Sequence, residues 1–548
     1  MKTLIIGGVA GGASTAARLR RLDEQAEIVM LERGEYISFA NCGLPYYIGD
    51  VIKKKEFLVV QTPESFHSRF RVDVRTFSEA IAINREQKTV TVKNLRTGET
   101  YEESYDNLVL SPGAEPIRPA YAQIDSDRIF TLRNLPDTYK IKDFLQNKGC
   151  RSAIIVGGGY IGIEMIENLQ RNGVAVTLLQ RSGQVLRKTL DENMACLAHK
   201  ELKKHGVNLC FHQNIETVED NGSEIIVHTK EGDTFRADCL VLSIGVAPEG
   251  ALAKNAGLPV SDKGCILVDS HMRTEDPSIY ALGDAIQVTH FVSGQQVHIP
   301  LAGPANRQGR IVADNIAGLN SVYHGTQGTA ILKCFDLTIA ATGLTETAAK
   351  AAGFDYETIF VFPPSHAGYY PGATEISIKT VFEKETGRIL GAQLIGKEGV
   401  DKRCDVFATA IRGNMTIFDL VHLELSYAPP FSSAKDPVNI VGLVGENMLT
   451  GKYKTFQLED IPNLDPNEVT LLDIRTVKEF TKGRIPNFIN IPLDTLRDNL
   501  DKLDRSKPIY MLCHVGLRSY IGYRILVQNG FDCRSLNGGY ELYLNVFK

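Results

Sequence analysis

Short apolar runs alternate with helix-like stretches at two places in the first half of the chain. Lys2–Ile6 and Ile28–Leu31 are apolar runs of strand length, and Ser14–Leu22 between them is predicted to be a helix. The same order returns at Ala153–Val156 and Ala175–Leu179, again with a helix between the runs. Strand, helix, strand is the βαβ unit of a parallel sheet, so the pattern predicts two α/β domains about one domain length apart.

Each first strand runs into a glycine-rich turn. The first turn is GGVAGG over residues 7–12, and the second is GGGYIG over residues 157–162. Such glycines let the backbone approach a pyrophosphate at a helix N-terminus. Only the second turn has the full G-x-G-x-x-G spacing, because Val9 takes the place of the middle glycine in the first. One loop of this kind can be an ordinary turn, but two predict two nucleotide sites, with contacts at Gly7, Gly12, Gly157, Gly159 and Gly162.

The ends of the second strands carry the side chains that select the nucleotide. Glu32 stands at the right distance from the first loop to bind a ribose hydroxyl, and Arg33 follows it at the same cofactor site. In the second unit the strand ends in Gln180 and Arg181, a neutral and a basic residue that can accept a 2′-phosphate. NADPH is therefore expected to be used at least as well as NADH. Glu164, in the helix after the second loop, is expected on the cofactor side.

Cys42 lies in the stretch SFANCGLPYY, residues 38–47, and has no second cysteine nearby. A redox cycle at this thiol must therefore exchange with a sulfur brought from outside. Gly43 and Pro45 predict a turn into a short helix, and a thiol at a helix N-terminus is expected to shift toward thiolate. The alternative is a small buried hydrophobic residue.

Composition limits the classes of protein that the chain can belong to. Its 548 residues predict roughly three to four domains. With 43% hydrophobic residues, 23% charged residues and a net charge of −5, the chain is not expected to bind nucleic acid. No apolar stretch approaches the ~18 residues of a membrane span, and no membrane partner or signal segment is expected. Ten cysteines without C-x-x-C spacing oppose a metal site and a secreted disulfide framework, so a cytoplasmic location is expected.

Two further segments are similar to motifs of flavoproteins. Residues 105–114, YDNLVLSPGA, are similar to the crossover motif, which implies FAD contacts at Ser111, Pro112 and Gly113. Residues 274–285, TEDPSIYALGDA, resemble the late FAD motif, in which Gly283 and Asp284 match the residues at the ribityl chain. Because the second glycine loop lies between these motifs, the nicotinamide domain is expected to be inserted within the FAD domain.

Together these motifs resemble the pyridine nucleotide-disulfide oxidoreductases over roughly residues 1–447, and within them the single-cysteine branch. That branch contains NADH oxidases, NADH peroxidases and coenzyme A-disulfide reductases. The resemblance implies that hydride passes from NAD(P)H to FAD and that the electrons then reduce an oxidised sulfur at Cys42. Ala10 stands where the oxidases and peroxidases carry a histidine in the first loop. This difference favours the coenzyme A branch.

A basic helix face is the first candidate for coenzyme A. Ser14, Arg18 and Arg21 are spaced i, i+4 and i+7 on the first predicted helix, so they share a face that can present cations to phosphates. A solvated basic face is the equally weighted alternative. The coenzyme A branch further implies substrate contacts at Ser38, Asn41, His298 and Lys435.

Two tyrosines match motifs in which the coenzyme A-disulfide reductases reach across a dimer interface. They are Tyr369 in HAGYYPG, residues 366–372, and Tyr427 in SYAPPFSSAKD, residues 426–436. The resemblance implies that both act at Cys42 of the other subunit of a homodimer, where a phenol can protonate a leaving thiolate. Exposed turn tyrosines packed against glycine and proline are the alternative.

The pattern changes after residue 447 and a new α/β unit begins. A strand over 508–512 delivers Cys513 into a loop that opens a helix, a way to stabilise a thiolate, a persulfide or an anion. Arg518 follows Cys513 by five positions, whereas the cysteine loop of low-molecular-weight phosphatases needs six. The segment resembles a rhodanese domain, whose signature is met by Asp473, Arg475, Glu479, Phe480, Asn490, Ile491, Pro492, Cys513, Gly516, Arg518 and Ser519. Arg484 stands where rhodaneses usually have histidine.

The sequence therefore predicts an α/β protein with two Rossmann-like domains, an α+β dimerisation domain and a rhodanese domain. The expected domains are FAD-binding over 1–120 and 245–325, NAD(P)-binding over 121–244, dimerisation over 326–447, a linker over 448–460 and rhodanese over 461–548. The expected function is FAD-dependent reduction of coenzyme A disulfide, persulfide or polysulfide by NAD(P)H, with sulfur transfer at Cys513. The alternatives are an NADH oxidase or peroxidase with a rhodanese domain, and a non-catalytic sulfur carrier or redox sensor.

Overall fold

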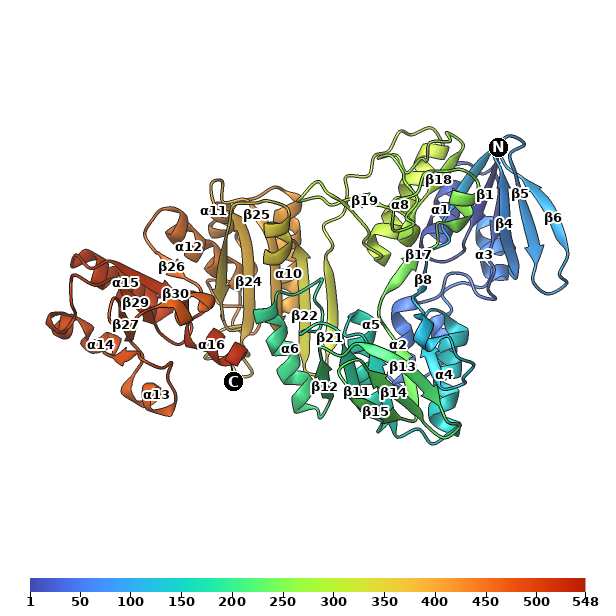
Figure 1. The fold of residues 1–548 in the computed structure, drawn as a ribbon. Coiled ribbons are helices and arrows are strands. Elements are labelled where there is room, and N and C mark those ends of the chain that lie inside the picture. The colour runs from blue at the N-terminus through green and yellow to red at the C-terminus, as the bar shows by residue number, and fades with distance from the viewer. Residues whose placement is uncertain (548) are drawn as a thin grey trace. The chain divides into compact units, whose positions relative to one another are not determined.

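The computed structural model describes residues 1–547 and forms two compact units. The first unit comprises residues 1–185 and 206–328, and the second comprises residues 186–205 and 329–547. Figure 1 labels the elements of both units. Residues 186–205 fall within the range expected for the NAD(P)-binding domain, yet they pack with the dimerisation and rhodanese segments.

A parallel five-stranded sheet forms the first half of the first unit, in the order β18-β7-β1-β2-β3. Helix α1 (Ala10–Leu22) packs against α8 (Ala302–Ile316), a helix that comes from the far end of the same unit in sequence. The core of this part is apolar and includes fully buried Leu4, Ile5 and Leu108. The strands are β1 (Lys2–Ile6), β2 (Glu27–Leu31), β3 (Asp73–Arg75), β7 (Asn107–Leu110) and β18 (Ile279–Ala281).

A second parallel sheet, in the order β12-β11-β10-β16-β9, repeats this architecture within the same unit. Its pairs run parallel, with Ser152 opposite Ala175 and Ala153 opposite Cys239. The two predicted βαβ units are thus present at the predicted positions. The elements are β9 (Ile129–Thr131), β10 (Ser152–Val156), β11 (Ala175–Gln180), β12 (Asn208–Phe211) and β16 (Cys239–Leu242), with helices α4 (Leu135–Asn147) and α5 (Tyr160–Arg171).

Smaller antiparallel elements and short helices complete the first unit. Two three-stranded sheets follow the orders β4-β5-β6 and β13-β14-β15, and two-stranded ribbons pair β8 with β17 and β19 with β20. Their bounds are β4 (Ser78–Asn84), β5 (Thr89–Asn94), β6 (Thr100–Ser104), β8 (Ala114–Pro116), β13 (Ile215–Asp220), β14 (Ile225–Thr229), β15 (Thr234–Ala237), β17 (Val246–Pro248), β19 (Val288–Thr289) and β20 (Gln296–Val297). The short helices are α2 (Leu44–Ile48), α3 (Pro63–Phe70) and α7 (Ala251–Asn255), with 3-10 turns η1 (Asn41–Gly43), η2 (Lys55–Leu58), η3 (Ala120–Ala122) and η4 (Gly283–Ala285).

The second unit contains an antiparallel sheet in the order β21-β22-β25-β24-β23. Its central strands β24 and β25 are buried along almost their whole length, so the sheet is covered on both sides. The strands are β21 (Ala330–Cys334), β22 (Leu337–Gly343), β23 (Tyr356–Val361), β24 (Ile376–Glu383) and β25 (Ile389–Gly396). The helices are α6 (Glu192–Lys204), α9 (Glu346–Ala351), α10 (Val400–Arg412), α11 (Ile417–Val421) and α12 (Pro437–Leu449).

The C-terminal part of the second unit is a parallel sheet in the order β26-β30-β29-β27-β28. Its edge strand β26 lies within residues 448–460, the segment expected to be a linker, and α12 also extends into that segment. These residues are therefore structured rather than a loose connection. The strands are β26 (Thr455–Phe456), β27 (Thr470–Asp473), β28 (Ile489–Asn490), β29 (Ile509–Leu512) and β30 (Cys533–Leu536), and the helices are α13 (Val477–Lys482), α14 (Leu493–Leu496), α15 (Leu517–Gln528) and α16 (Gly539–Phe547), with 3-10 turns η5 (Leu458–Asn463) and η6 (Arg497–Lys502).

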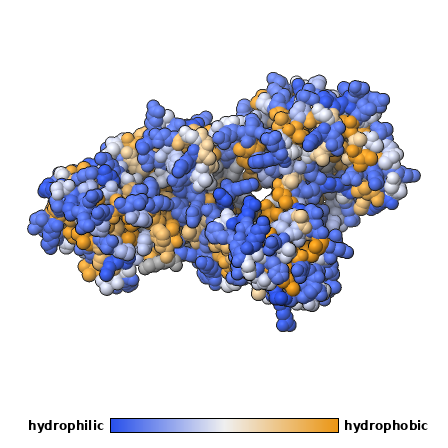
Figure 2. All heavy atoms as spheres, viewed as in Figure 1, coloured by the Kyte–Doolittle hydropathy of each residue, from blue (hydrophilic) through white to orange (hydrophobic). Residues whose placement is uncertain are grey.

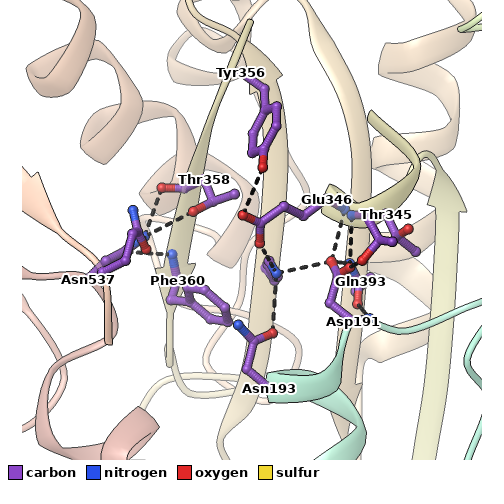
Figure 3. Close-up of polar contacts among 12 residues, drawn as sticks. Asp191, Asn193, Thr345, Glu346, Tyr356, Thr358, Phe360, Gln393 and Asn537 are labelled. Carbon is purple, nitrogen blue, oxygen red and sulfur yellow. Dashed lines mark hydrogen bonds and ion pairs between the residues drawn. The ribbon is translucent and has the colours of Figure 1, made fainter. Parts of the chain in front are cut away.

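A buried ion pair joins α6 to the antiparallel sheet of the second unit. Lys379 on β24 is fully buried, and its ammonium lies 3.0 Å from Asp191 and 2.6 Å from Glu346. Figure 3 labels Asp191 and Glu346 and draws their polar contacts as dashed lines. The Asp191 carboxylate also accepts a 2.6 Å hydrogen bond from the amide of Gln393 on β25. Burial opposes ionisation of Asp191, but the Lys379 charge and these hydrogen bonds hold the pKa of Asp191 below its usual range.

The rhodanese segment joins the same sheet through one asparagine. The Asn537 amide donates to the Thr358 carbonyl oxygen at 2.9 Å, and its oxygen accepts from the Phe360 amide at 3.0 Å (Figure 3). Both partners belong to the edge strand β23, so Asn537 satisfies backbone groups that a sheet edge leaves unpaired. Lys200 of α6 adds a 2.7 Å hydrogen bond to the Leu544 carbonyl oxygen on α16.

In the space-filling view the visible face is mostly hydrophilic, and its hydrophobic residues form several separate groups (Figure 2). Within residues 1–547, no helix has the length and apolar character needed to cross a bilayer.

Candidate functional site

The first glycine loop has room only for glycine at positions 7 and 12, which correspond to the first and last glycines of G-x-G-x-x-G. Gly7 has φ +98°, and a Cβ there would lie 2.1 Å from the Ser111 carbonyl oxygen. A Cβ on Gly12 would lie 1.9 Å from the Gly7 carbonyl oxygen. Val9 has φ −94°, outside the left-handed region, so a β-branched residue is tolerated there. The departure from G-x-G-x-x-G therefore leaves the loop intact.

The second loop repeats this geometry. Gly157 has φ +100°, and its Cβ would lie 2.6 Å from the Ser243 carbonyl oxygen. A Cβ on Gly162 would lie 2.1 Å from the Gly157 carbonyl oxygen, whereas one on Gly159 would meet no atom within 4 Å. The open side at Gly159 is where a pyrophosphate can approach the N-terminus of α5. Both loops thus fit a dinucleotide.

The strand-end side chains occupy equivalent places in the two sheets. The Glu32 carboxylate accepts hydrogen bonds from the Gly8 amide at 2.9 Å and the Gly34 amide at 2.8 Å. Gln180 accepts from the Gly158 amide at 2.9 Å in the same way, and Arg181 next to it is exposed. An acid therefore stands at the first site and a neutral side chain at the second.

Arg33, expected at the FAD site, is engaged by protein carboxylates. Its guanidinium lies 2.8 Å from Glu249 and also pairs with Glu115. The Arg33 guanidinium, which the sequence predicted to contact FAD, is therefore paired with these two acids. Burial works against the ionised form of Arg33, but the two acids keep its pKa above the usual value.

The late FAD motif places Asp284 in the turn η4, directly after β18. Burial raises the pKa of Asp284. His298, expected at coenzyme A, lies with its Nε2 2.7 Å from the Asp284 carbonyl oxygen. The histidine therefore packs beside the FAD motif. The backbone amide of Gly283 is held by the Gln308 side chain of α8 at 2.8 Å.

Arg133 is a cation at this site that sequence patterns did not reveal. A Cβ on Gly113 would lie 2.6 Å from its guanidinium, and its charge favours ionised Asp284. Its Nε is buried and has no hydrogen-bond partner among residues 1–547. A buried unpaired donor beside the crossover motif fits an anionic cofactor such as FAD. Arg133 follows β9 and belongs to no sequence motif with a defined spacing, so only the folded structure identifies it as part of this site.

Cys42 lies in the turn η1, immediately before α2. All ten cysteines are free thiols, and Cys42 alone among them is exposed. Its surroundings desolvate the sulfur, and the carboxylates of Glu164 and Asp284 add negative charge, so the pKa of Cys42 is raised. The expected shift toward thiolate is therefore wrong for the protein without its cofactor. A three-residue turn and a five-residue helix supply too little dipole to overcome the burial of the sulfur and the two acids.

Glu164 on α5 is the acid that links the thiol to the second nucleotide loop. The Tyr46 hydroxyl of α2 donates to its carboxylate at 3.1 Å. Burial raises the pKa of Glu164 to about 7, and burial next to this acid raises the pKa of Tyr46. Glu164 therefore changes charge near neutral pH, within electrostatic range of Cys42.

The other side chains expected at coenzyme A differ in whether they already have polar partners within the protein. The Asn41 side-chain oxygen is buried and accepts no hydrogen bond from residues 1–547, which fits a ligand donor. Ser38 lies beside it with φ +43° and donates its backbone amide to the Gly8 carbonyl oxygen. Arg18 is 2.8 Å from Asp314 of α8, and Ser14 donates to Asn306 at 2.5 Å. The exposed Arg21 is separate from these pairs, so the expected basic face is partly neutralised.

In the second unit the two predicted tyrosines lie side by side. Tyr369 and Tyr427 are 76% and 49% exposed, and their hydroxyl oxygens are 3.1 Å apart. Lys435, in the same motif as Tyr427, is also exposed. Two motifs far apart in sequence thus form one surface.

Arg403 on α10 holds the two tyrosine loops together, although no sequence pattern pointed to it. Its guanidinium is 1% exposed and donates to the carbonyl oxygens of Ser365 at 3.0 Å and Phe431 at 3.3 Å. It also pairs with the Asp436 carboxylate at 3.0 Å. Both tyrosine loops are therefore bound to the same buried guanidinium.

The rhodanese loop surrounds Cys513 at the end of β29. Cys513 is 1% exposed, and the Gly516 amide lies 3.2 Å from its sulfur. The amide of Tyr540, at the start of α16, holds the Cys513 carbonyl oxygen at 2.8 Å. Arg518 makes two hydrogen bonds to Glu479, at 2.7 and 2.6 Å, so it braces the loop against α13 rather than pointing freely at the sulfur. A loop amide aimed at a thiol stabilises negative sulfur.

The chain matches three family models. The pyridine nucleotide-disulphide oxidoreductase model matches residues 1–309, its dimerisation domain matches residues 329–437, and the rhodanese-like domain matches residues 461–545. The chain belongs to the pyridine nucleotide-disulphide oxidoreductases. FAD and a nicotinamide nucleotide are the cofactors of this family, in agreement with the two loops described above.

Relatives of this oxidoreductase include proteins with named activities. A coenzyme A disulfide reductase of Staphylococcus epidermidis is 39% identical over 442 residues, which is 80% of this chain and 99% of the relative. The crystal structure of reduced Bacillus anthracis CoADR-RHD is 50% identical, covers 100% of this chain and 98% of that chain, and superposes with a TM-score of 0.97. An NAD-dependent persulfide reductase from A. fulgidus is 37% identical, covers 99% and 100%, and has a TM-score of 0.92.

Proposed function

We propose that this protein is an FAD-dependent NAD(P)H:coenzyme A-disulfide and coenzyme A-persulfide reductase, with a rhodanese domain that carries sulfane sulfur. One observation carries the proposal: Cys42 is the exposed member of ten free thiols and lies beside both nucleotide motifs. A lone accessible thiol at such a place exchanges with an external disulfide. The coenzyme A substrate follows from the named relatives.

The proposed reaction consumes NAD(P)H, a proton and coenzyme A disulfide, and releases NAD(P)⁺ and two molecules of coenzyme A. The Cys42 thiolate attacks one sulfur of the substrate, which forms a mixed disulfide and releases the first coenzyme A. Bound FAD supplies the electron pair that cleaves this mixed disulfide. With a coenzyme A persulfide, the same two electrons and two protons give coenzyme A and hydrogen sulfide.

Glu164 and the tyrosine pair provide protons for these steps. Because the pKa of Glu164 is about 7, part of this side chain is carboxylate near neutral pH, and that form can accept the Cys42 proton. Tyr369 and Tyr427 are exposed on the dimerisation domain, and we assign them to Cys42 of the other subunit, where a phenol protonates the leaving thiolate. A homodimer is therefore part of the proposal.

Coenzyme A is expected to contact Ser38, Asn41, Arg21 and Lys435. The unpartnered Asn41 oxygen supports this assignment, since the adenine, pantetheine and hydroxyl groups of coenzyme A offer donors. Cys513 is the sulfur carrier, because the Gly516 amide at its sulfur can stabilise a persulfide. The domain limits predicted from the sequence and a cytoplasmic location belong to the same proposal, since ten free thiols suit a reducing compartment.

Steady-state rates with different acceptors test this function. The holoenzyme is assayed with NADPH or NADH and with coenzyme A disulfide, coenzyme A persulfide, polysulfide, oxygen or hydrogen peroxide. The proposal predicts fast turnover with the sulfur acceptors and slow consumption of oxygen and peroxide. Faster oxygen or peroxide reduction identifies an oxidase or peroxidase, and no turnover with any acceptor identifies a sulfur carrier or redox sensor.

A further inference from the structure

A pair of buried thiols lies in the NAD(P)-binding part of the first unit. Cys150 comes just before β10 and Cys239 is the first residue of β16. Their sulfurs are 3.7 Å apart, and the residues are 9% and 2% exposed. No step of the proposed reaction uses either thiol.

The backbones that carry the two thiols are fixed next to each other. Strands β10 and β16 pair in parallel, with Ala153 opposite Cys239. The Asp238 carboxylate accepts from the amides of Arg151 and Ser152, both at 2.8 Å. The sulfurs therefore need only side-chain rotation and a small local shift to close from 3.7 Å to a bond of about 2.05 Å.

The two thiols differ in exposure more than in charge. Either thiol can donate the hydrogen bond between the two sulfurs, and the Cys150 sulfur also lies 3.5 Å from the Ser152 carbonyl oxygen. The charges of Asp238 and Arg128 act on both thiols in the same direction, so they do not distinguish them. Access to an external disulfide therefore sets the order of attack, with Cys150 as the nucleophile and Cys239 as the resolving thiol.

Cys150 is the more accessible of the two. Residues 146–149, which run from the end of α4 into the turn before β10, are exposed, and Gly149 has φ +64°. Opening this turn exposes Cys150 without separating any sheet strand. Cys239 lies within the sheet and is 2% exposed.

We propose that Cys150 and Cys239 form a second redox site, which low-molecular-weight disulfides oxidise to an intramolecular disulfide. The Cys150 thiolate attacks one sulfur of the small disulfide, forms a mixed disulfide and releases one small thiol. The Cys239 thiol then attacks the Cys150 sulfur, forms the internal S–S bond and releases the second small thiol. The two cysteine protons end on the two released thiols, so the protein loses two electrons and the small disulfide gains them.

The cross-link leaves the nucleotide loop in place, because it lies at the opposite ends of the same two strands. At the loop end, the Ser243 hydroxyl donates to the carbonyl oxygens of Val156 at 3.0 Å and Gly157 at 2.7 Å. The site is thus independent of Cys42 and of the proposed reaction, and its test is a peptide map rather than a rate.

The test uses the holoenzyme without NAD(P)H. The protein is incubated with glutathione disulfide, denatured in N-ethylmaleimide and digested with trypsin, which leaves Cys150 in peptide 149–151 and Cys239 in peptide 237–254. The proposal predicts that these two peptides appear as one disulfide-linked species that reductant separates. Recovery of both peptides alkylated, or of a stable glutathione adduct on Cys150 without the linked species, overturns it.

Single variants separate the two roles. Cys239→Ser is expected to stop at a glutathione adduct on Cys150, whereas Cys150→Ser leaves Cys239 fully alkylated. Cys210→Ser, on the edge strand β12 of the same sheet, is the matched control and should give the same linked species as the wild type. FAD content reports folding of each variant, and Cys239→Ala replaces Cys239→Ser if that variant does not retain FAD. A glutathione adduct on Cys239 in Cys150→Ser contradicts the assigned order of attack.

Discussion

The hydroxyl oxygens of Tyr369 and Tyr427 lie 3.1 Å apart, although 58 residues separate them in the chain. A tyrosine hydroxyl is protonated at neutral pH, and the hydrogen bond between the two phenols raises the pKa of Tyr369 further. A protonated phenol is the form that an acid for a leaving thiolate requires. The buried guanidinium of Arg403 fixes the two loops that bring the pair together.

Removing one phenol is expected to slow the reaction without unfolding the protein. Tyr427→Phe should lower kcat/KM for coenzyme A disulfide by about a hundredfold, because the leaving thiolate loses its acid. Tyr370→Phe, a neighbouring and exposed tyrosine, is the control and should stay close to the wild-type value. Equal losses in both variants would mean that the loop, and not the phenol pair, matters.

Mixed dimers test whether the site is shared between subunits. If the tyrosines act on the other subunit's thiol, a Cys42→Ser subunit combined with a Tyr427→Phe subunit contains one complete site per heterodimer. Mixing and reassembling the two inactive variants should restore up to half of the wild-type activity per heterodimer. If activity does not return although heterodimers are isolated, the site is built within one chain.

The preference between NADPH and NADH is expected to depend on the residues at the end of β11. Gln180 is neutral where an acid selects for the ribose diol of NADH, and Arg181, Arg187 and Lys188 are exposed basic residues after it. NADPH is expected to be used at least as well as NADH, and Arg181→Gln should raise the KM for NADPH more than that for NADH. A preference for NADH of about a hundredfold in kcat/KM contradicts this interpretation.

The two reactive cysteines are expected to respond differently to the acceptor. Cys513→Ser should spare the reduction of coenzyme A disulfide, which reaches Cys42 directly, and should depress turnover of polysulfide. Cys533→Ser is the control, since Cys533 is also buried, and its sulfur lies 3.2 Å from the Met511 sulfur and 3.9 Å from the Arg534 carbonyl oxygen. Equal polysulfide rates for wild type and Cys513→Ser would show that the rhodanese domain does not feed the flavin site.

The buried Lys379 is expected to dominate the stability of the second unit. Lys379→Met leaves Asp191 and Glu346 without their cation and should cost about 3–5 kcal/mol in the free energy of unfolding. Lys384→Met removes an exposed pair with Glu357 and should cost less than about 1 kcal/mol. Urea unfolding of both variants gives the comparison.

The pH dependence of that loss has a defined sign. Because the folded pKa of Asp191 is depressed, its ionisation stabilises the fold above the unfolded pKa of about 3.9, and this contribution disappears as the pH falls through the folded pKa. The difference between wild type and Lys379→Met should therefore shrink below about pH 4. A difference that stays constant as the pH falls well below about 4 excludes the ion pair as its source.

Much of the architecture could be predicted because it rests on local patterns. The two βαβ units and the turn from Cys42 into a short helix follow from short local patterns of apolar residues, glycine and proline, and the structure has them at the predicted residues. The roles of Arg403, Arg133 and Asp191 could not be predicted from the sequence. Each of these residues acts on groups that are far away in the sequence and that only the folded chain brings close. The pKa of Cys42 was predicted in the wrong direction for the same reason, since Glu164 and Asp284 are distant in sequence but near in space.

The most direct test of the account is the Cys42→Ser variant assayed with NADPH and coenzyme A disulfide. Serine cannot form the mixed disulfide, so the variant should keep its FAD and lose NAD(P)H-dependent reduction, whereas the buried-thiol control Cys265→Ser should keep both. Normal turnover of coenzyme A disulfide by FAD-loaded Cys42→Ser would contradict the proposed mechanism.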